Sequence, residues 1–126
     1  MYEYRVLDVP RVIDGDTFDF DLDLGFYAIL RIRVRLADID TYEIFGRNAH
    51  PLGQPAKQAA DEWMAQRLES KTLRVRTMAG NSNVPIGDGS FGRWLGEVYD
   101  GQTGELLADS LKEAGFDKVD SVRKTR

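Results

Sequence analysis

The first third of the chain alternates between apolar and polar positions with a period of two, which is typical of strands that bury one face. The alternation runs through residues 18–24 and again through residues 28–39, after a segment rich in β-branched and aromatic residues at positions 4–13. An Asp-Gly step at residues 14–15 separates the first two segments, and this dipeptide between strand-like segments favours a hairpin. We therefore predict a three-stranded antiparallel meander.

The same alternation predicts which side chains of the meander face the core. The expected apolar face consists of Phe18, Phe20, Leu22, Leu24, Leu30, Ile32, Val34 and Leu36. The charged residues between them are expected to face solvent, namely Asp19, Asp21, Asp23, Arg31, Arg33 and Arg35.

Helical spacing of apolar residues appears twice in the rest of the chain. One helix is predicted from Pro55, a residue type that suits the first turn of a helix, to about Leu68. A second, short helix is predicted from Leu106, with Gly115 as the residue that follows its C-cap.

Two more alternating segments, residues 71–78 and 93–100, bring the number of predicted strands to five. The resulting order is three strands, a helix, two strands and a helix, which is the order of a five-stranded OB-fold barrel. A chain of 126 residues fits one such domain, covering residues 1–126.

Composition narrows the class of protein. Hydrophobic residues make up 42% and charged residues 30% of the chain, a balance typical of soluble domains. No apolar run approaches the roughly 18 residues of a membrane span, so no membrane partner is expected. The net charge of −4 argues against a general coat for nucleic acid, but a few arginines and a cation can still bind phosphate.

The sequence says less about the cellular location and the oligomeric state of the protein. It begins without an apolar leader, so a cytoplasmic location is the default expectation, with a secreted mature form or a phage origin left open. The absence of cysteine excludes disulfides and thiolate metal sites. A monomer is the default expectation for the oligomeric state.

Three local motifs resemble known sites without the context that such sites require. Residues 87–92 spell G-x-G-x-x-G, but the next segment alternates as a strand where the dinucleotide fingerprint needs a helix. Residues 19–23 begin like an EF-hand loop, yet Leu24 and Leu30 occupy the positions that need Gly and Glu. His50 has no second histidine or cysteine with which to share a metal, and we predict that it is a surface loop residue.

Residues suited to catalysis gather where the predicted strands end. Asp16 follows the first hairpin, and Asp40, Thr41 and Glu43 follow the third strand. Two aspartates that converge from neighbouring strands repel each other unless a cation lies between them, and hard oxygen ligands select Ca²⁺ or Mg²⁺. Glu43 is then placed to deprotonate a water beside that cation.

Two arginines supply the complementary charge. Arg35 lies late on the third strand, and Arg93 opens the fifth. Guanidinium groups match phosphate oxygens bidentately, so this set of residues suits the attack of water on a phosphodiester. Two plainer interpretations stay open on these residues alone, a simple Asp-Gly-Asp turn and ion pairing at the surface.

Three segments resemble the staphylococcal nuclease (thermonuclease) family, in the family's order. They are Val-Ile-Asp-Gly-Asp-Thr at residues 12–17, Val-Arg-Leu-Ala-Asp-Ile-Asp-Thr-Tyr-Glu at residues 34–43, and Phe-Gly-Arg at residues 91–93. The similarity covers roughly residues 5–119. It implies an OB-fold whose third, C-terminal helix is absent or truncated in this chain.

The resemblance also implies an activity. The family hydrolyses DNA and RNA with Ca²⁺ and leaves 3′-phosphates, which implies a sugar-nonspecific endonuclease that prefers single-stranded nucleic acid. Asp16 and Asp40 would bind Ca²⁺ through their carboxylates, and Thr41 through its backbone carbonyl.

The catalytic roles follow from the same resemblance. Glu43 would act as the general base, while Arg35 and Arg93 would hold the phosphate and stabilise the transition state. The alternative is a catalytically silent OB-fold module that binds nucleic acid or protein, and Glu43 is the residue that discriminates between the two.

The chain departs from the family's usual pattern at four positions. Tyr42 replaces a proline before Glu43, and Ser90 and Phe91 replace a Lys-Tyr pair before Gly-Arg. Ser121 stands where the family has a tyrosine near the substrate base. The change at Tyr42 predicts a looser Glu43 loop, those at Ser90 and Phe91 predict weaker recognition of the terminal phosphate and nucleotide, and Ser121 predicts the loss of stacking on the base.

Overall fold

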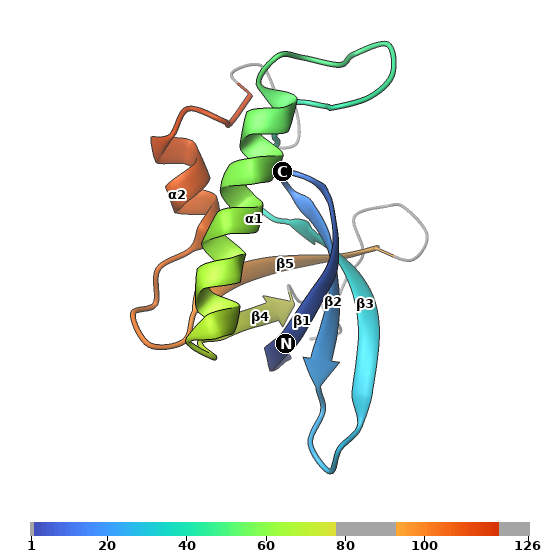
Figure 1. The fold of residues 1–126 in the computed structure, drawn as a ribbon, viewed down its shortest axis with the longest axis vertical. Helices are drawn as coiled ribbons and strands as arrows, with labels where there is room; N and C mark the ends of the chain where they lie inside the picture. Colours follow the sequence, from blue (N-terminus) through green and yellow to red (C-terminus); the bar gives the residue numbers. More distant parts are fainter. Residues whose placement is uncertain (1, 78–92, 119–126) are drawn as a thin grey trace, which may run out of the picture.

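The computed structural model describes residues 2–77 and 93–118. Its elements are, in chain order, β1 (Glu3–Asp14), β2 (Thr17–Asp23), β3 (Ile29–Leu36), α1 (Gly53–Glu69), β4 (Leu73–Thr77), β5 (Arg93–Asp100) and α2 (Leu107–Glu113). The five strands form a closed barrel in the order β1-β2-β3-β5-β4, and both helices cover it from one side (Figure 1). The predicted OB-fold-like architecture is confirmed. The prediction about a third helix concerns residues 119–126, outside the described part of the chain.

The β2–β3 pairing explains the alternation of the sequence. Phe18, Phe20 and Leu22 fill the barrel interior and are almost completely buried. On the outer face the antiparallel register brings two of the three aspartates of β2, Asp19 and Asp21, opposite arginines of β3. Asp19 binds Arg33 and Asp21 binds Arg31, each pair with a closest N–O distance of 2.7 Å. The outer arginines are therefore neutralised across the strands, which disfavours a free basic stripe there.

The prediction for the far end of this hairpin was wrong. Leu24 and Leu30 were expected in the core, but 39% and 49% of their surfaces are exposed. The hairpin continues beyond the barrel (Figure 1), where no opposing sheet covers it. Alternation identifies the face of a strand, but the length of the barrel decides how much of that face is buried.

The third strand is shorter than the alternation predicted. It ends at Leu36, because Asp38 takes a left-handed backbone conformation with φ of 66°. Aspartate tolerates this conformation better than most residues. The turn that results carries the following segment, which includes Asp40, across the end of the barrel.

The helices were predicted correctly in kind and nearly in extent. α1 begins at Gly53, so Pro55 lies in its first turn, and Ala56, Ala60, Trp63 and Met64 are its buried apolar residues. These residues seal the barrel against β1, where α1 makes its main contacts.

The second helix, α2, packs beside α1 and against β5. It buries Leu107 and Leu111. Gly115 follows its C-cap with φ of 84°, as predicted. Among the described residues, no helix has the length and apolar character needed to cross a membrane.

Candidate active site

Five of the six predicted site residues line one cleft. The cleft lies where the β1–β2 turn meets the segment after β3 and the start of β5, and its volume is about 240 Å³. Its lining includes Asp16, Asp40, Thr41, Glu43 and Arg93. Parallel pairing of β3 with β5 places Arg93 beside Arg33, three residues before the end of β3, and from there Arg93 also lines the cleft. Residues far apart in the sequence thus converge on one cleft, as we expect from their positions near the ends of strands.

Arg35, the sixth residue, is almost fully buried and is absent from the cleft lining. Its Nη2 lies 3.2 Å from Asp16 Oδ2 and 3.2 Å from Asp40 Oδ1, so one nitrogen joins both carboxylates. Nη1 donates to the carbonyls of Leu36 and Ile39. The expectation that Arg35 faces solvent was wrong, because the segment after β3 folds over it.

Asp16 is held by several hydrogen bonds in a buried position. Its Oδ1 accepts from Thr17 Oγ1 at 3.0 Å, and its Oδ2 accepts from the Thr41 amide at 3.0 Å. Burial, reinforced by the hydrogen bond and charge of Asp14, raises the pKa of Asp16 to about 7, although Arg35 and the Thr41 amide lower it. The Asp16 carboxylate therefore lacks enough nearby positive charge to stay ionised easily.

This pKa predicts how stability depends on pH. The folded protein binds the Asp16 proton more tightly than the unfolded chain, whose aspartate titrates near 3.8. The free energy of unfolding should therefore fall as pH rises from about 4 to 7, by up to roughly 4 kcal/mol at 1.36 kcal/mol per pKa unit. Urea denaturation at pH 5 and pH 8, in the presence of a chelator, measures the difference. If Asp16→Asn shows the same pH slope as the wild type, another group is responsible.

Asp40 is positioned by the segment that follows α2. The Asp40 amide donates to Asp117 Oδ1 at 3.2 Å, and the Lys118 amide donates to the Asp40 carbonyl at 2.8 Å. Thr41 and Asp117 also form an isolated antiparallel bridge. Sequence reasoning missed Asp117, since no local pattern indicates a contact between residues so distant in the chain.

Asp14 is a second residue that sequence reasoning left out. It lines the cleft, and its Oδ1 accepts from the Asp16 amide at 3.1 Å. Its position in the Asp-Gly-Asp turn was the available signal, because this hydrogen bond spans two residues of a tight turn.

The Glu43 segment is fixed by a ring stack between Tyr42 and His50. The rings of Tyr42 and His50 stack with centroids 3.9 Å apart and an interplanar angle of 20°. The His50 amide donates to the Glu43 carbonyl at 2.9 Å, while His50 Nδ1 accepts from the Leu52 amide. His50 is exposed, as predicted, but it also anchors the loop that carries the exposed Glu43.

Two glycines allow the close approach of backbone segments around the site. A Cβ on Gly53, the first residue of α1, would lie 2.5 Å from the Glu43 carbonyl oxygen. A Cβ on Gly15 would lie 2.9 Å from Thr41 Oγ1. The Glu43 carbonyl near Gly53 belongs to the backbone and can move away less readily than the Thr41 side chain near Gly15. The lack of a side chain at Gly53 is therefore the stricter of the two requirements, and it allows the observed position of Glu43.

Gly53→Ala should therefore displace Glu43 and lower any catalytic rate through this residue by about tenfold to 100-fold, since displacements near 1 Å can have effects of this size. Circular dichroism should show an intact helix, because alanine has a higher helix propensity than glycine. Asp61→Ala, an exposed substitution to alanine on the same helix and outside the cleft lining, is the control and should leave the rate unchanged. An unchanged rate in Gly53→Ala would show that this contact does not position Glu43.

The donor chemistry of the cleft fits a hard divalent cation. The carboxylates of Asp14, Asp16, Asp40 and Glu43 line it, opposed by Arg93 and by Arg35 beneath. Across the described residues, no three acidic, histidine or cysteine side chains are grouped as a ready metal site. A cation here would therefore depend on two convergent carboxylates, Asp16 and Asp40, completed by carbonyl and water oxygens, as Ca²⁺ accepts.

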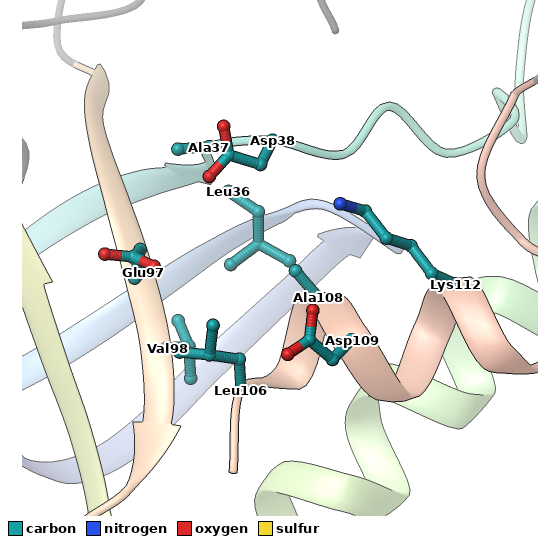
Figure 2. A pocket seen from close by; sticks show the side chains of 9 residues that line it. All are labelled: Leu36, Ala37, Asp38, Glu97, Val98, Leu106, Ala108, Asp109 and Lys112. Carbon is teal, nitrogen blue, oxygen red and sulfur yellow. The ribbon is translucent and has the colours of Figure 1, made fainter. Parts of the chain in front are cut away.

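A second cleft, between β5, α2 and the end of β3, is too small for a nucleotide (Figure 2). Its volume is about 50 Å³, enough for a few water molecules. Asp38, Glu97, Asp109 and Lys112 point their charged groups around it. Of these two clefts, the one lined by Asp16 and Asp40 is therefore the better candidate for a substrate site.

The remaining sequence predictions concern residues outside the described part of the chain. They include the substitutions at Ser90, Phe91 and Ser121 and the glycines of residues 87–92. β5 does begin as a strand directly after this segment, which supports the rejection of a dinucleotide fingerprint.

No protein-family profile matches the chain, and no curated protein matches it significantly. The barrel and the cleft therefore define the class: an OB-fold-like protein with an acidic, arginine-containing cleft at the end of its barrel.

Proposed function

We propose that this protein is a Ca²⁺-dependent nuclease of the staphylococcal nuclease type, acting on single-stranded DNA or RNA. The observation that carries the proposal is the convergence of Asp16, Asp40, Thr41, Glu43 and Arg93 on one open cleft. Each of them is also the residue type that the resemblance to the nuclease family implies at that position for phosphodiester hydrolysis.

The proposed roles divide between the floor and the rim of the cleft. Asp16 and Asp40, with the Thr41 carbonyl, would hold Ca²⁺, which supplies positive charge for the phosphate and for activation of water. Glu43, exposed at the rim, would accept the proton of the attacking water. Arg93 would donate hydrogen bonds to the phosphoryl oxygens as negative charge accumulates on them.

Arg35 would act first as the support of this arrangement. Its Nη2 fixes both carboxylates, and its buried Nε has no hydrogen-bond partner in the structure. If a bound cation shared the negative charge of Asp16 and Asp40, Arg35 would be released from these carboxylates and could direct donors toward a phosphate. This release would give Arg35 the phosphate-binding role that the resemblance implies.

One observation favours the catalytically silent module as a second candidate. Arg35 pairs with both Asp16 and Asp40, and the raised pKa of Asp16 lets its carboxyl hold a proton near neutral pH, so the cluster is balanced without any metal ion. Such a cluster can serve structure alone, leaving the barrel to bind nucleic acid or protein.

Cleavage of heat-denatured DNA and of RNA, with millimolar Ca²⁺ or with a chelator, distinguishes the candidates. The nuclease proposal predicts Ca²⁺-dependent fragments from both substrates, with 3′-phosphate ends that ligase and kinase treatment can identify. DNA binding without cleavage would support the silent module. The net charge of −4 also predicts few phosphate contacts and hence weak binding that salt abolishes.

A further inference from the structure

The tip of the β2–β3 hairpin exposes a large apolar surface. This tip patch consists of Leu24, Phe26, Tyr27, Ile29 and Leu30. Phe26 and Tyr27 are fully exposed, and 61% of Ile29 is exposed. The hairpin carries them away from the barrel, at its lower end in Figure 1. No neighbouring element of the described chain is placed to cover them.

The backbone of the tip is strained in order to present these rings. The Ala28 amide donates to the Gly25 carbonyl at 2.9 Å, which closes a turn with Phe26 and Tyr27 at its centre. Their φ angles are 53° and 61°, the left-handed values of a type I′ turn. Such turns favour Asn-Gly, and bulky residues adopt these angles at a cost. Strain and exposure both cost free energy in the isolated chain, and a partner that buries these rings would offset part of that cost.

An apolar cavity lies next to the tip patch. This mouth, about 400 Å³ in volume, is the end of the barrel interior and includes Tyr2, Tyr4 and Trp94 in its lining. Leu24 and Leu30 belong to both the mouth and the tip patch, so the two features are contiguous. The mouth is large enough to receive an aromatic side chain.

The charges of the hairpin favour a partner that is neither nucleic acid nor an anionic membrane. The guanidiniums of Arg31 and Arg33 are each held by two hydrogen bonds, to Asp21 and Asp19 respectively. They are therefore occupied and offer little to a phosphate. The tip patch is better matched by a partner surface that is itself apolar and whose neighbouring charges are paired with each other. A second copy of this chain has such a surface.

We propose that the tip patch and the mouth form the interface of a homodimer, in which the tip of each copy lies over the mouth of the other. The tip patch and the mouth lie next to each other, so two copies related by a twofold axis can each place their tip over the partner's mouth. Such an isologous contact uses the same surface on both copies and gives a closed dimer. Phe26 and Tyr27 alone contribute roughly 400 Å². Tyr2, Leu24, Ile29, Leu30 and Trp94, which are 39% to 61% exposed, add a comparable area, so complete burial of tip and mouth would approach the roughly 800 Å² per partner of a standard interface.

This dimer would leave the candidate active site open. Asp16 precedes β2 and Asp40 follows β3, whereas the tip joins the other ends of the same strands. The inference therefore stands independently of the proposed nuclease function.

Sedimentation velocity between ~1 and ~100 µM protein tests the proposal, a range suited to a micromolar dissociation constant. The wild type should shift from monomer to dimer with concentration. The double variant Phe26→Asn/Tyr27→Gly should weaken dimerisation by about 100-fold or more, because central aromatic residues dominate interfaces. It should fold at least as stably as the wild type, since Asn-Gly suits the turn.

Leu7→Ser, which alters a partly exposed apolar residue of β1 outside the patch, is the control and should dimerise normally. A wild type that stays monomeric throughout, or a double variant that dimerises like the wild type, would overturn the proposal. A monomeric wild type that floats with phosphatidylcholine vesicles through Phe26 and Tyr27 would also overturn it, in favour of a lipid surface.

Discussion

Glu43→Gln is expected to lower the rate of phosphodiester cleavage by about 10²–10⁴-fold, the usual effect of losing a general base. The amide has the same shape as the carboxylate but cannot accept the proton of the attacking water. Glu43 is exposed, and the hydrogen bond that fixes its segment goes to its backbone carbonyl, so the substitution should spare the fold. Single-turnover cleavage of a labelled single-stranded oligonucleotide at saturating Ca²⁺ measures the chemical step.

Binding provides the control for this prediction. Fluorescence anisotropy should show that Glu43→Gln binds the oligonucleotide as the wild type does. Glu62→Gln, an exposed substitution on α1 outside the cleft, should leave both rate and binding unchanged. If Glu43→Gln cleaves at the wild-type rate, the proton is accepted elsewhere and the proposed role of Glu43 fails.

Removing Arg35 is expected to cause a large loss of both stability and activity. Arg35→Met leaves Asp16 and Asp40 buried without their shared cationic partner, a change that typically costs about 3–5 kcal/mol. The loss should be smaller at pH 5 than at pH 8, because Asp16, with its raised pKa, is protonated at the lower pH. Urea denaturation at the two pH values measures both effects.

Two further variants test whether the loss comes from the uncompensated carboxylates. Adding Asp16→Asn to Arg35→Met should restore much of the stability, while Arg31→Met, which breaks a surface pair, should change it little. Ca²⁺ should also stabilise Arg35→Met more than the wild type. An Arg35→Met protein as stable as the wild type at pH 8 would contradict the described role of the ion pairs.

The barrel could be predicted from the sequence because the local alternation of apolar and charged residues agrees with the long-range pairing of the strands. Phe18 and Phe20 alternate with Asp19 and Asp21, which lie opposite arginines of β3 in the β2–β3 register. Strand ends also predicted the gathering of Asp16 and Asp40, since β2 begins and β3 ends at the same end of the barrel. These conclusions needed only the order of strands and turns.

Other features of the site depend on contacts that no local pattern reveals. Asp117 reaches Asp40 across most of the chain, and the Tyr42–His50 stack forms only because the loop closes on itself. The burial of Arg35 likewise depends on the segment that folds over the strand, and alternation alone placed it in solvent. Tertiary packing decided these positions, and it also decided the exposure of Leu24 and Leu30.

The most direct test of the central claim is the cleavage of heat-denatured DNA by the wild-type protein in millimolar Ca²⁺, beside a chelator control and Glu43→Gln. Fragments should appear only with Ca²⁺, and Glu43→Gln should nearly abolish them. Folded protein that binds the DNA and leaves it intact in Ca²⁺ would contradict the nuclease proposal and identify the cleft as a structural charge cluster in a binding module.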